Sequence, residues 1–139
     1  PWAVLAAEGL PSFHGVTTSG AEVSNATLAG RLTLLHFWAT WCPVCNLEEG
    51  TIQSISESTP TITVAMASGT NGEVQQHLAE NSLDFTTIND THGVLSERWG
   101  VVGVPMSFVV DPGGEIRFAE LGYTTGVGLR LRLLLAEYF

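Results

Sequence analysis

Cys42 and Cys45 are the only two cysteines of the chain, and Pro43 and Val44 stand between them. Thiols at this spacing can close an intramolecular disulfide, so the pair can exchange two electrons with a thiol or disulfide of another molecule. Cys42 comes just before a helical pattern, and the unpaired N–H groups and dipole at a helix N-terminus lower the pKa of a thiol. We therefore expect Cys42 to be the nucleophile and Cys45 to resolve the mixed disulfide formed on Cys42.

The same pair of thiols has three other possible uses. A structural disulfide is one, but a bridge across two residues constrains little chain and stabilises it little. Zinc is another, but two sulfurs are half of a structural site, and the sequence has no second Cys-x-x-Cys and no closely spaced histidine pair. Cu(I) is the third, because soft thiolates suit this ion. The context of a strand followed by a helix favours redox chemistry over these uses.

The segments around the cysteines predict how they are held. Residues 32–38 are almost uniformly apolar, as expected for a strand buried on both faces of a sheet. A helix should follow from Pro43 and end before Pro60. Apolar spacing in this helix predicts that one stripe faces the core, namely Val44, Leu47, Thr51 and Ile55.

The rest of the chain alternates between strand and helix patterns. Strands are expected at 61–67, 85–88, 107–110 and 116–120, and helices at 72–80, 93–99 and 127–138. Two further stripes should face the core, Val74 with Leu78, and Val127 with Leu131, Leu134 and Tyr138. The pattern predicts an α/β fold with a central mixed sheet flanked by helices, preceded by an N-terminal extension at 12–31 that adds a small hairpin.

Composition limits what this chain can be. It has 139 residues, 45% of them hydrophobic and 14% charged, which indicates one globular domain. Fourteen acidic residues against five basic ones give a net charge of −9, which excludes nucleic acid as a partner. The chain contains no lysine, so Schiff-base chemistry and Walker-type phosphate binding are excluded as well.

Two motifs resemble a known family. The segment at 37–45, Phe-Trp-Ala-Thr-Trp-Cys-Pro-Val-Cys, is similar to the active-site segment of thioredoxin-fold proteins, in particular the membrane-anchored TlpA/ResA/DsbE type of bacterial thiol-disulfide oxidoreductase. The segment at 99–114 resembles the cis-proline segment of that family. Within it, the first motif is most similar to disulfide oxidoreductases associated with suppression of copper sensitivity. The resemblance implies a thioredoxin-like domain at 20–139, with 1–19 as an extension or residual linker.

The resemblance also implies a substrate site. By itself, Pro105 would be expected to be an ordinary trans proline that ends a loop. The family pattern instead implies a cis bond at Pro105 and a substrate-binding loop in which the backbone of Val104 pairs with an extended protein segment. Trp41 is expected to contact substrate, together with the intervening residues Pro43 and Val44.

Three positions near the cysteines have two interpretations each. Glu48 matches a family glutamate that assists proton transfer, and the alternative is a solvated helix carboxylate like its neighbour Glu49. His36 could relay a proton beneath the disulfide, since its ordinary pKa is near neutrality, whereas a lone histidine in an apolar strand is more often a core residue. Gly50 stands where the family has a helix-kinking proline. The remaining histidines are expected to be exposed, namely His14, His77 and His92.

The predicted function is thiol-disulfide exchange with protein thiols or disulfides, using the chain's own sulfurs and no cofactor or metal. The family favours a reductase, and the enzymatic alternative is a protein disulfide oxidase or isomerase. A Cu(I)-binding chaperone and a thioredoxin-like binding module are the non-enzymatic alternatives. We expect a monomer that works with a membrane or periplasmic redox partner. The expected location is periplasmic or otherwise extracytoplasmic, with a membrane anchor in a segment missing from this sequence.

Overall fold

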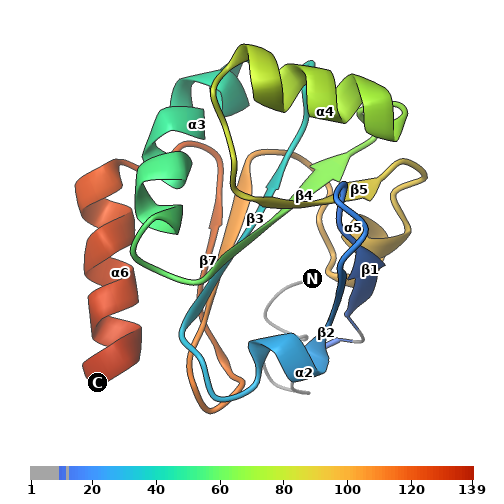
Figure 1. Ribbon diagram of the computed structural model, residues 1–139. Coiled ribbons are helices and arrows are strands. Elements are labelled where there is room, and N and C mark those ends of the chain that lie inside the picture. The colour runs from blue at the N-terminus through green and yellow to red at the C-terminus, as the bar shows by residue number, and fades with distance from the viewer. Residues whose placement is uncertain (1–9, 12) are drawn as a thin grey trace.

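A mixed sheet of five strands forms the centre of the computed structural model, which describes residues 10–11 and 13–139 (Figure 1). In spatial order the strands are β5 (Thr86–Asp90), β4 (Thr61–Met66), β3 (Thr33–Trp38), β6 (Met106–Val110) and β7 (Ile116–Leu121). The strand that leads to the cysteines, β3, is central, parallel to β4 and antiparallel to β6. The active-site segment therefore starts from the most constrained strand of the sheet.

Helices and a hairpin cover the two faces of this sheet. The first face carries α3 (Pro43–Ser56), α4 (Asn71–Glu80) and α6 (Gly126–Tyr138). The second is covered by α2 (Asn25–Leu28), α5 (Val94–Arg98) and the antiparallel pair β1 (His14–Val16) and β2 (Glu22–Ser24). Among the described residues, no helix is both long and apolar enough to span a bilayer.

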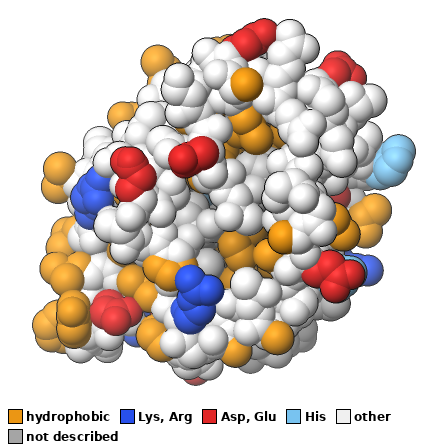
Figure 2. All heavy atoms as spheres, viewed as in Figure 1, with side chains coloured by type: hydrophobic (Ala, Val, Ile, Leu, Met, Phe, Trp, Pro, Cys, Tyr) orange, Lys and Arg blue, Asp and Glu red, His pale blue; other side chains and the backbone are white. Residues whose placement is uncertain are grey.

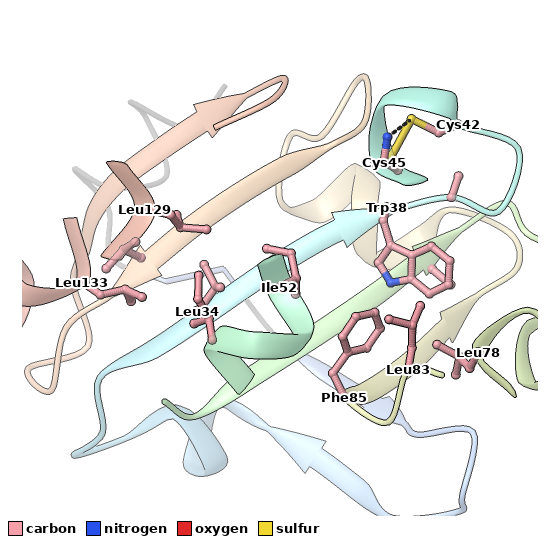
Figure 3. Packing of buried hydrophobic residues seen from close by; sticks show 14 of the residues in the cluster. Leu34, Trp38, Cys42, Cys45, Ile52, Leu78, Leu83, Phe85, Leu129 and Leu133 are labelled. Atoms are coloured by element: carbon pink, nitrogen blue, oxygen red, sulfur yellow. Dashed lines mark hydrogen bonds between the residues drawn. A yellow bond between two sulfur atoms is a disulfide. The ribbon is translucent and has the colours of Figure 1, made fainter. Parts of the chain in front are cut away.

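The alternation of β3 divides the core into two clusters. Leu34 and Trp38 point to the α3 face, where they pack with Ile52 and both cysteines (Figure 3). Leu35 and Phe37 point to the opposite face, because neighbouring residues of a strand alternate in direction. By the same alternation the buried His36 lies on the α3 face, beneath the active-site helix. A polar side chain is thus placed in the middle of an apolar layer.

The strands and helices predicted from sequence are present in the predicted order, and the thioredoxin-like fold class is confirmed. α3 runs unbroken through Gly50, where the family pattern has a kinking proline. The proposed domain boundary at residue 20 falls in the turn of the β1–β2 hairpin. Residues 1–9 and 12 of the predicted extension lie outside the described residues.

Two predicted core stripes differ from the faces that the helices bury. In α3 the predicted Ile55 is buried, but Val44 and Leu47 are exposed and Thr51 is half-buried. The other buried residues of α3 are Cys45, Glu48, Glu49 and Ile52. In α6 the predicted stripe is exposed as well, namely Val127, Leu131, Leu134 and Tyr138, and hydrophobic side chains lie along this helix at the left of Figure 2. The buried residues of α6 are Leu129, Leu133 and Ala136. Both sets have helical spacing, so periodicity alone could not say which one meets the sheet. The Val74–Leu78 pair is buried as predicted.

Candidate active site

Cys42 and Cys45 form a disulfide at the N-terminus of α3, with their Cα atoms 5.2 Å apart. Cys42 is the N-cap, Pro43 takes the first helical position where no N–H is needed, and Cys45 is the third. The backbone N–H of Cys45 donates to Sγ of Cys42 at 3.1 Å. No acidic residue lies in the first turn of this helix. These features favour negative charge on the Cys42 sulfur.

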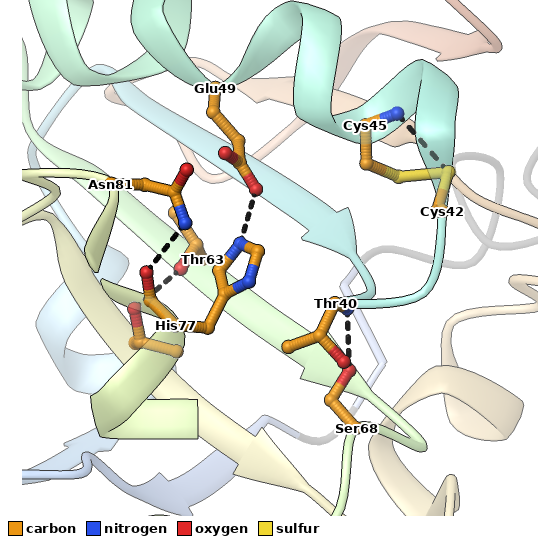
Figure 4. A network of polar contacts seen from close by, with 9 residues as sticks. Thr40, Cys42, Cys45, Glu49, Thr63, Ser68, His77 and Asn81 are labelled. Atoms are coloured by element: carbon orange, nitrogen blue, oxygen red, sulfur yellow. Dashed lines mark hydrogen bonds and ion pairs between the residues drawn. A yellow bond between two sulfur atoms is a disulfide. The ribbon is translucent and has the colours of Figure 1, made fainter. Parts of the chain in front are cut away.

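The loop before the cysteines is fastened to the loop that follows β4 (Figure 4). The N–H of Thr40 donates to Oγ of Ser68 at 3.0 Å, and the indole N–H of Trp41 donates to the carbonyl of Ala67 at 3.0 Å. Trp41 is nevertheless 59% exposed, whereas Trp38 is buried in the core. Of these two tryptophans, Trp41 is therefore the one available to a partner, and its hydrogen bond to the Ala67 carbonyl orients the ring.

Val104 and Pro105 lie beside the sulfur of Cys42, although 62 residues separate Cys42 from Val104 in sequence. The Val104 carbonyl oxygen is 3.7 Å from Cys42 Sγ, and the Val104–Pro105 peptide bond is cis. Val104 precedes β6, which begins at Met106, so it lies outside the ladder of the sheet. The loop is held from behind by the N–H of Gly122, which donates to the Pro105 carbonyl at 2.8 Å.

Glu48 is fully buried one turn after Cys45, so its interpretation as a solvated carboxylate is wrong. Residues three apart share a helix face, which places Glu48 on the same side of α3 as Cys45. The backbone N–H of Thr124 donates to Oε2 of Glu48 at 2.8 Å. Within residues 10–11 and 13–139, Oε1 has no hydrogen-bond partner. Burial raises the pKa of Glu48, and the Thr124 bond opposes this rise in part.

His36 lies close to the free oxygen of Glu48. Its Nε2 is 3.8 Å from Glu48 Oε1, and its Nδ1 lies 2.8 Å from the hydroxyl oxygen of Ser107. Ser107 is the antiparallel register partner of His36, from β6. Burial lowers the pKa of His36 from 6.5 to about 3, so the ring is neutral at ordinary pH. The two predicted proton-transfer residues are therefore close together beneath the active-site helix.

Glu49, the next residue of α3, forms a second glutamate–histidine pair. Glu49 Oε1 is 2.6 Å from Nε2 of His77, which comes from α4 (Figure 4). Glu49 is buried and His77 is largely covered, so the prediction of an exposed His77 is wrong. The ring of His77 also lies over Trp38, with ring centroids 5.3 Å apart. This contact could not be predicted from local sequence, because α4 and α3 meet only in the folded chain.

Ser107, Thr124 and Ser68 belong to the site and were missed in the sequence. Ser107 could have been noticed as the one polar residue in the strand Met106–Val110. Thr124 contributes its backbone N–H, and Ser68 accepts a hydrogen bond from the backbone N–H of Thr40. Contacts with the backbone leave no signature in the sequence. In the described part of the chain, no group of three or more His, Cys, Asp and Glu side chains is arranged to hold a metal ion. The soft ligands at the site are the two sulfurs.

A thioredoxin-like sheet with Cys-x-x-Cys at the start of a helix, opposite a cis-proline loop, defines a class of redox domains. The model of the AhpC/TSA family matches residues 6–119 of this chain. Sporulation thiol-disulfide oxidoreductase A of Bacillus subtilis is 30% identical over 141 aligned positions, in an alignment that covers 94% of this chain and 85% of that protein. The chain therefore belongs to the AhpC/TSA family, among its thioredoxin-like thiol-disulfide oxidoreductases.

Two further comparisons agree with this family assignment. The thioredoxin-like protein of Haemophilus influenzae is 37% identical over 108 residues, which are 77% of this chain and 64% of that protein. The chain thus spans slightly less than two thirds of this relative. A secreted Mycobacterium tuberculosis disulfide oxidoreductase homologous to Escherichia coli DsbE has a solved structure with a TM-score of 0.78 and 26% identity, covering 88% of this chain and 95% of that one. The Bacillus subtilis and Mycobacterium tuberculosis relatives are both named as disulfide oxidoreductases.

Proposed function

We propose that this domain exchanges a dithiol for a disulfide with protein partners and works as a reductase outside the cytoplasm. The observation that carries the proposal is the position of Cys42 Sγ, which receives the N–H of Cys45 at the start of a 14-residue helix and lies 3.7 Å from the Val104 carbonyl. The names of the relatives support exchange, and the secreted relative supports the location. The direction of exchange follows the family resemblance alone.

In the reducing direction the thiolate of Cys42 attacks one sulfur of the partner's disulfide. A mixed disulfide forms, and the other partner sulfur leaves as a thiolate that takes a proton. Cys45 then gives its proton to the Glu48 carboxylate and attacks Cys42 Sγ. The Cys42–Cys45 bond forms, the second partner sulfur leaves, and the partner has gained the two electrons that the dithiol lost. Glu48 is proposed as the proton acceptor because it lies on the same helix face as Cys45 and is shielded from water.

The surroundings of Cys42 support a protein substrate. Val104 lies outside the sheet ladder, so its backbone is placed to pair with an extended segment that presents its disulfide to Cys42. Exposed apolar side chains flank this position, and we propose that they cover the rest of the partner, namely Trp41, Val44, Val102, Leu121 and Tyr123. Backbone pairing and apolar contacts do not require a particular side chain in the partner, so the range of substrates should be broad.

Trapping and titration test this proposal. In Cys45→Ser the resolving thiol is gone, so mixed disulfides with protein partners should accumulate on Cys42, whereas Cys42→Ser should accumulate none. Ultraviolet titration of the same Cys45→Ser variant should give a Cys42 pKa below the ordinary value of about 8.5. A higher value would remove the activation by the helix N-terminus.

The equilibrium redox potential tests the direction. Members of this fold range from about −270 mV in reducing proteins to about −120 mV in oxidising ones. A potential near the lower value, measured against dithiothreitol or glutathione, is expected for a reductase. A potential near the upper value would make the domain an oxidase. Copper retained at one ion per chain after dialysis, without insulin reduction, would instead indicate the Cu(I) chaperone.

A further inference from the structure

We propose that Ser107 is a positioning residue that sets the tautomer of His36, so that His36 presents an N–H group to the free oxygen of Glu48. The geometry assigns a different part to each residue of this buried group: Glu48 carries the proton, His36 remains neutral, and Ser107 fixes the side of the ring on which the hydrogen stands. The kinetic part of this inference rests on the proposed role of Glu48. The tautomer itself does not.

The tautomer follows from what each atom can donate or accept. In the described part of the chain, His36 Nδ1 is the one hydrogen-bond partner of the Ser107 hydroxyl, at 2.8 Å, and Ser107 is buried. If Nδ1 carried the hydrogen, the hydroxyl hydrogen of Ser107 would be buried without an acceptor, which is unfavourable. The opposite arrangement satisfies both groups, since the hydroxyl donates to Nδ1 and the ring hydrogen stands on Nε2.

The same tautomer also supplies a hydrogen-bond donor for Glu48. Oε2 is already an acceptor for Thr124, and Oε1 faces Nε2 of His36 at 3.8 Å. When Glu48 is ionised, the charge on Oε1 requires a donor, and an N–H at Nε2 is the one that β3 supplies. A movement of about 1 Å by either side chain would bring the two atoms within hydrogen-bond distance. A bare Nε2 lone pair would instead repel the carboxylate.

The other carboxylates near Ser107, His36 and Glu48 are bonded to side chains outside this group. Glu49, next on α3, is bonded to His77 of α4, and Glu120 of β7, the register partner of Ser107, is bonded to Arg132 of α6 at 2.7 Å. Cys45 lies on the same helix face as Glu48. The ionisation of Glu48 is therefore governed by burial, by the Thr124 N–H and by the tautomer of His36.

The tautomer can be measured without any variant. Nitrogen-15 chemical shifts of the imidazole in the oxidised protein should identify His36 as a neutral ring protonated at Nε2, with Nδ1 as an acceptor. A hydrogen on Nδ1 would overturn the inference directly. This measurement does not depend on activity, so it separates failure of the inference from failure of the proposed exchange function.

Ser107→Ala then tests the consequence for Glu48. Loss of the hydroxyl should allow the second tautomer and raise the pKa of Glu48, followed by its side-chain carbon-13 signal. The pH profile for resolution of a mixed disulfide should move to higher pH by about one unit, a roughly tenfold loss of rate on its acidic limb. A rate lowered equally at every pH, or an unchanged carboxyl titration, would overturn the positioning role.

Thr63→Val is the matched control. Thr63 is the register partner of His36 on the opposite side, it is buried, and its hydroxyl bonds to Thr87 at 2.9 Å. Thr63→Val removes a buried hydroxyl from the same sheet but leaves the Ser107–His36 hydrogen bond in place. The pH profile should therefore not move. Ser107→Thr keeps the hydroxyl and should retain the wild-type tautomer. A shifted profile in Thr63→Val would assign the effect to general loosening of the sheet.

Discussion

Two adjacent glutamates of α3 each face a histidine of another element, and the two pairs differ in distance and in burial. Glu49 and His77 are 2.6 Å apart, directly bonded and near the surface. Glu48 and His36 are 3.8 Å apart, more deeply buried and not bonded to each other. A bonded pair at the rim of the fold ties α3 to α4. In the unbonded interior pair, burial lowers the pKa of His36 and raises that of Glu48, as is typical of functional sites, and this difference supports the proton-transfer role proposed above.

The difference arises from neighbouring positions on α3. Consecutive helix residues are about 100° apart around the axis, so Glu48 and Glu49 point to different elements although they are adjacent in sequence. Glu48 is directed to β3 and to the turn before α6, and Glu49 is directed to α4. Two adjacent glutamates thus have different partners because each points to a different part of the fold.

Acid unfolding should separate the two histidines most strongly. Burial holds the pKa of His36 at about 3 in the folded state, against 6.5 as its model value. The unfolded chain therefore binds a proton that the folded state refuses, so stability from this residue is complete above pH 6.5 and is lost as pH falls toward 3. The slope should reach roughly 1 kcal/mol for each pH unit.

Urea unfolding followed from about pH 7 to about pH 4 measures this slope. His36→Leu, which fills a similar volume with no ionisable group, should flatten it. His77→Gln should leave it in place, because His36 is still present. An unchanged slope in His36→Leu would mean that another group governs acid stability.

Exchange kinetics should separate the two glutamates. Glu48→Gln keeps the shape of the side chain but cannot accept the Cys45 proton, so resolution of a mixed disulfide at neutral pH should slow by about 100-fold. Glu49→Gln leaves that proton acceptor intact and should resolve at nearly the wild-type rate. Stopped-flow tryptophan fluorescence with a protein disulfide measures both. Equal slowing in the two variants would contradict the distinction drawn between them.

The contribution of Glu48 to stability should depend on pH in the direction opposite to that of His36, and Glu48→Gln tests this. The raised pKa of Glu48 means that the folded state holds its proton beyond 4.5, the model value. Its contribution is therefore present below pH 4.5 and is lost as pH rises through the folded pKa. Relative to the wild type, Glu48→Gln should gain stability as pH increases. A constant difference between the two proteins across this range would contradict the raised pKa.

The smallest expected effect concerns the bonded pair. His77→Gln or Glu49→Gln breaks a hydrogen bond between α3 and α4 and should lower the free energy of unfolding by about 2 kcal/mol. The double variant should lose less than the sum of the two, because one interaction is removed twice. Thermal or urea unfolding of the four proteins measures the coupling. Strict additivity would show that the pair does not tie the helices.

Much of the fold and part of the site could be predicted from local sequence. Cys-Pro-Val-Cys after an apolar segment indicates a thiol pair at a helix start, since strand, turn and N1 proline are all local preferences. The order of strands and helices follows in the same way from hydrophobic periodicity. The prediction failed where a helix offered two apolar faces, as in α6, because spacing identifies a face but not the surface that it meets.

The sequence by itself determined the cysteine pair, the order of elements and the acidic net charge. Only the tertiary structure decided that Val104 lies beside Cys42, that Ser107 bonds to His36 across 71 residues, and that Glu48 is buried. These contacts depend on strand register and helix packing, which bring together segments with no local influence on one another. The cysteine pair could therefore be identified from local sequence, whereas the buried contacts of Glu48 and His36 exist only in the folded sheet.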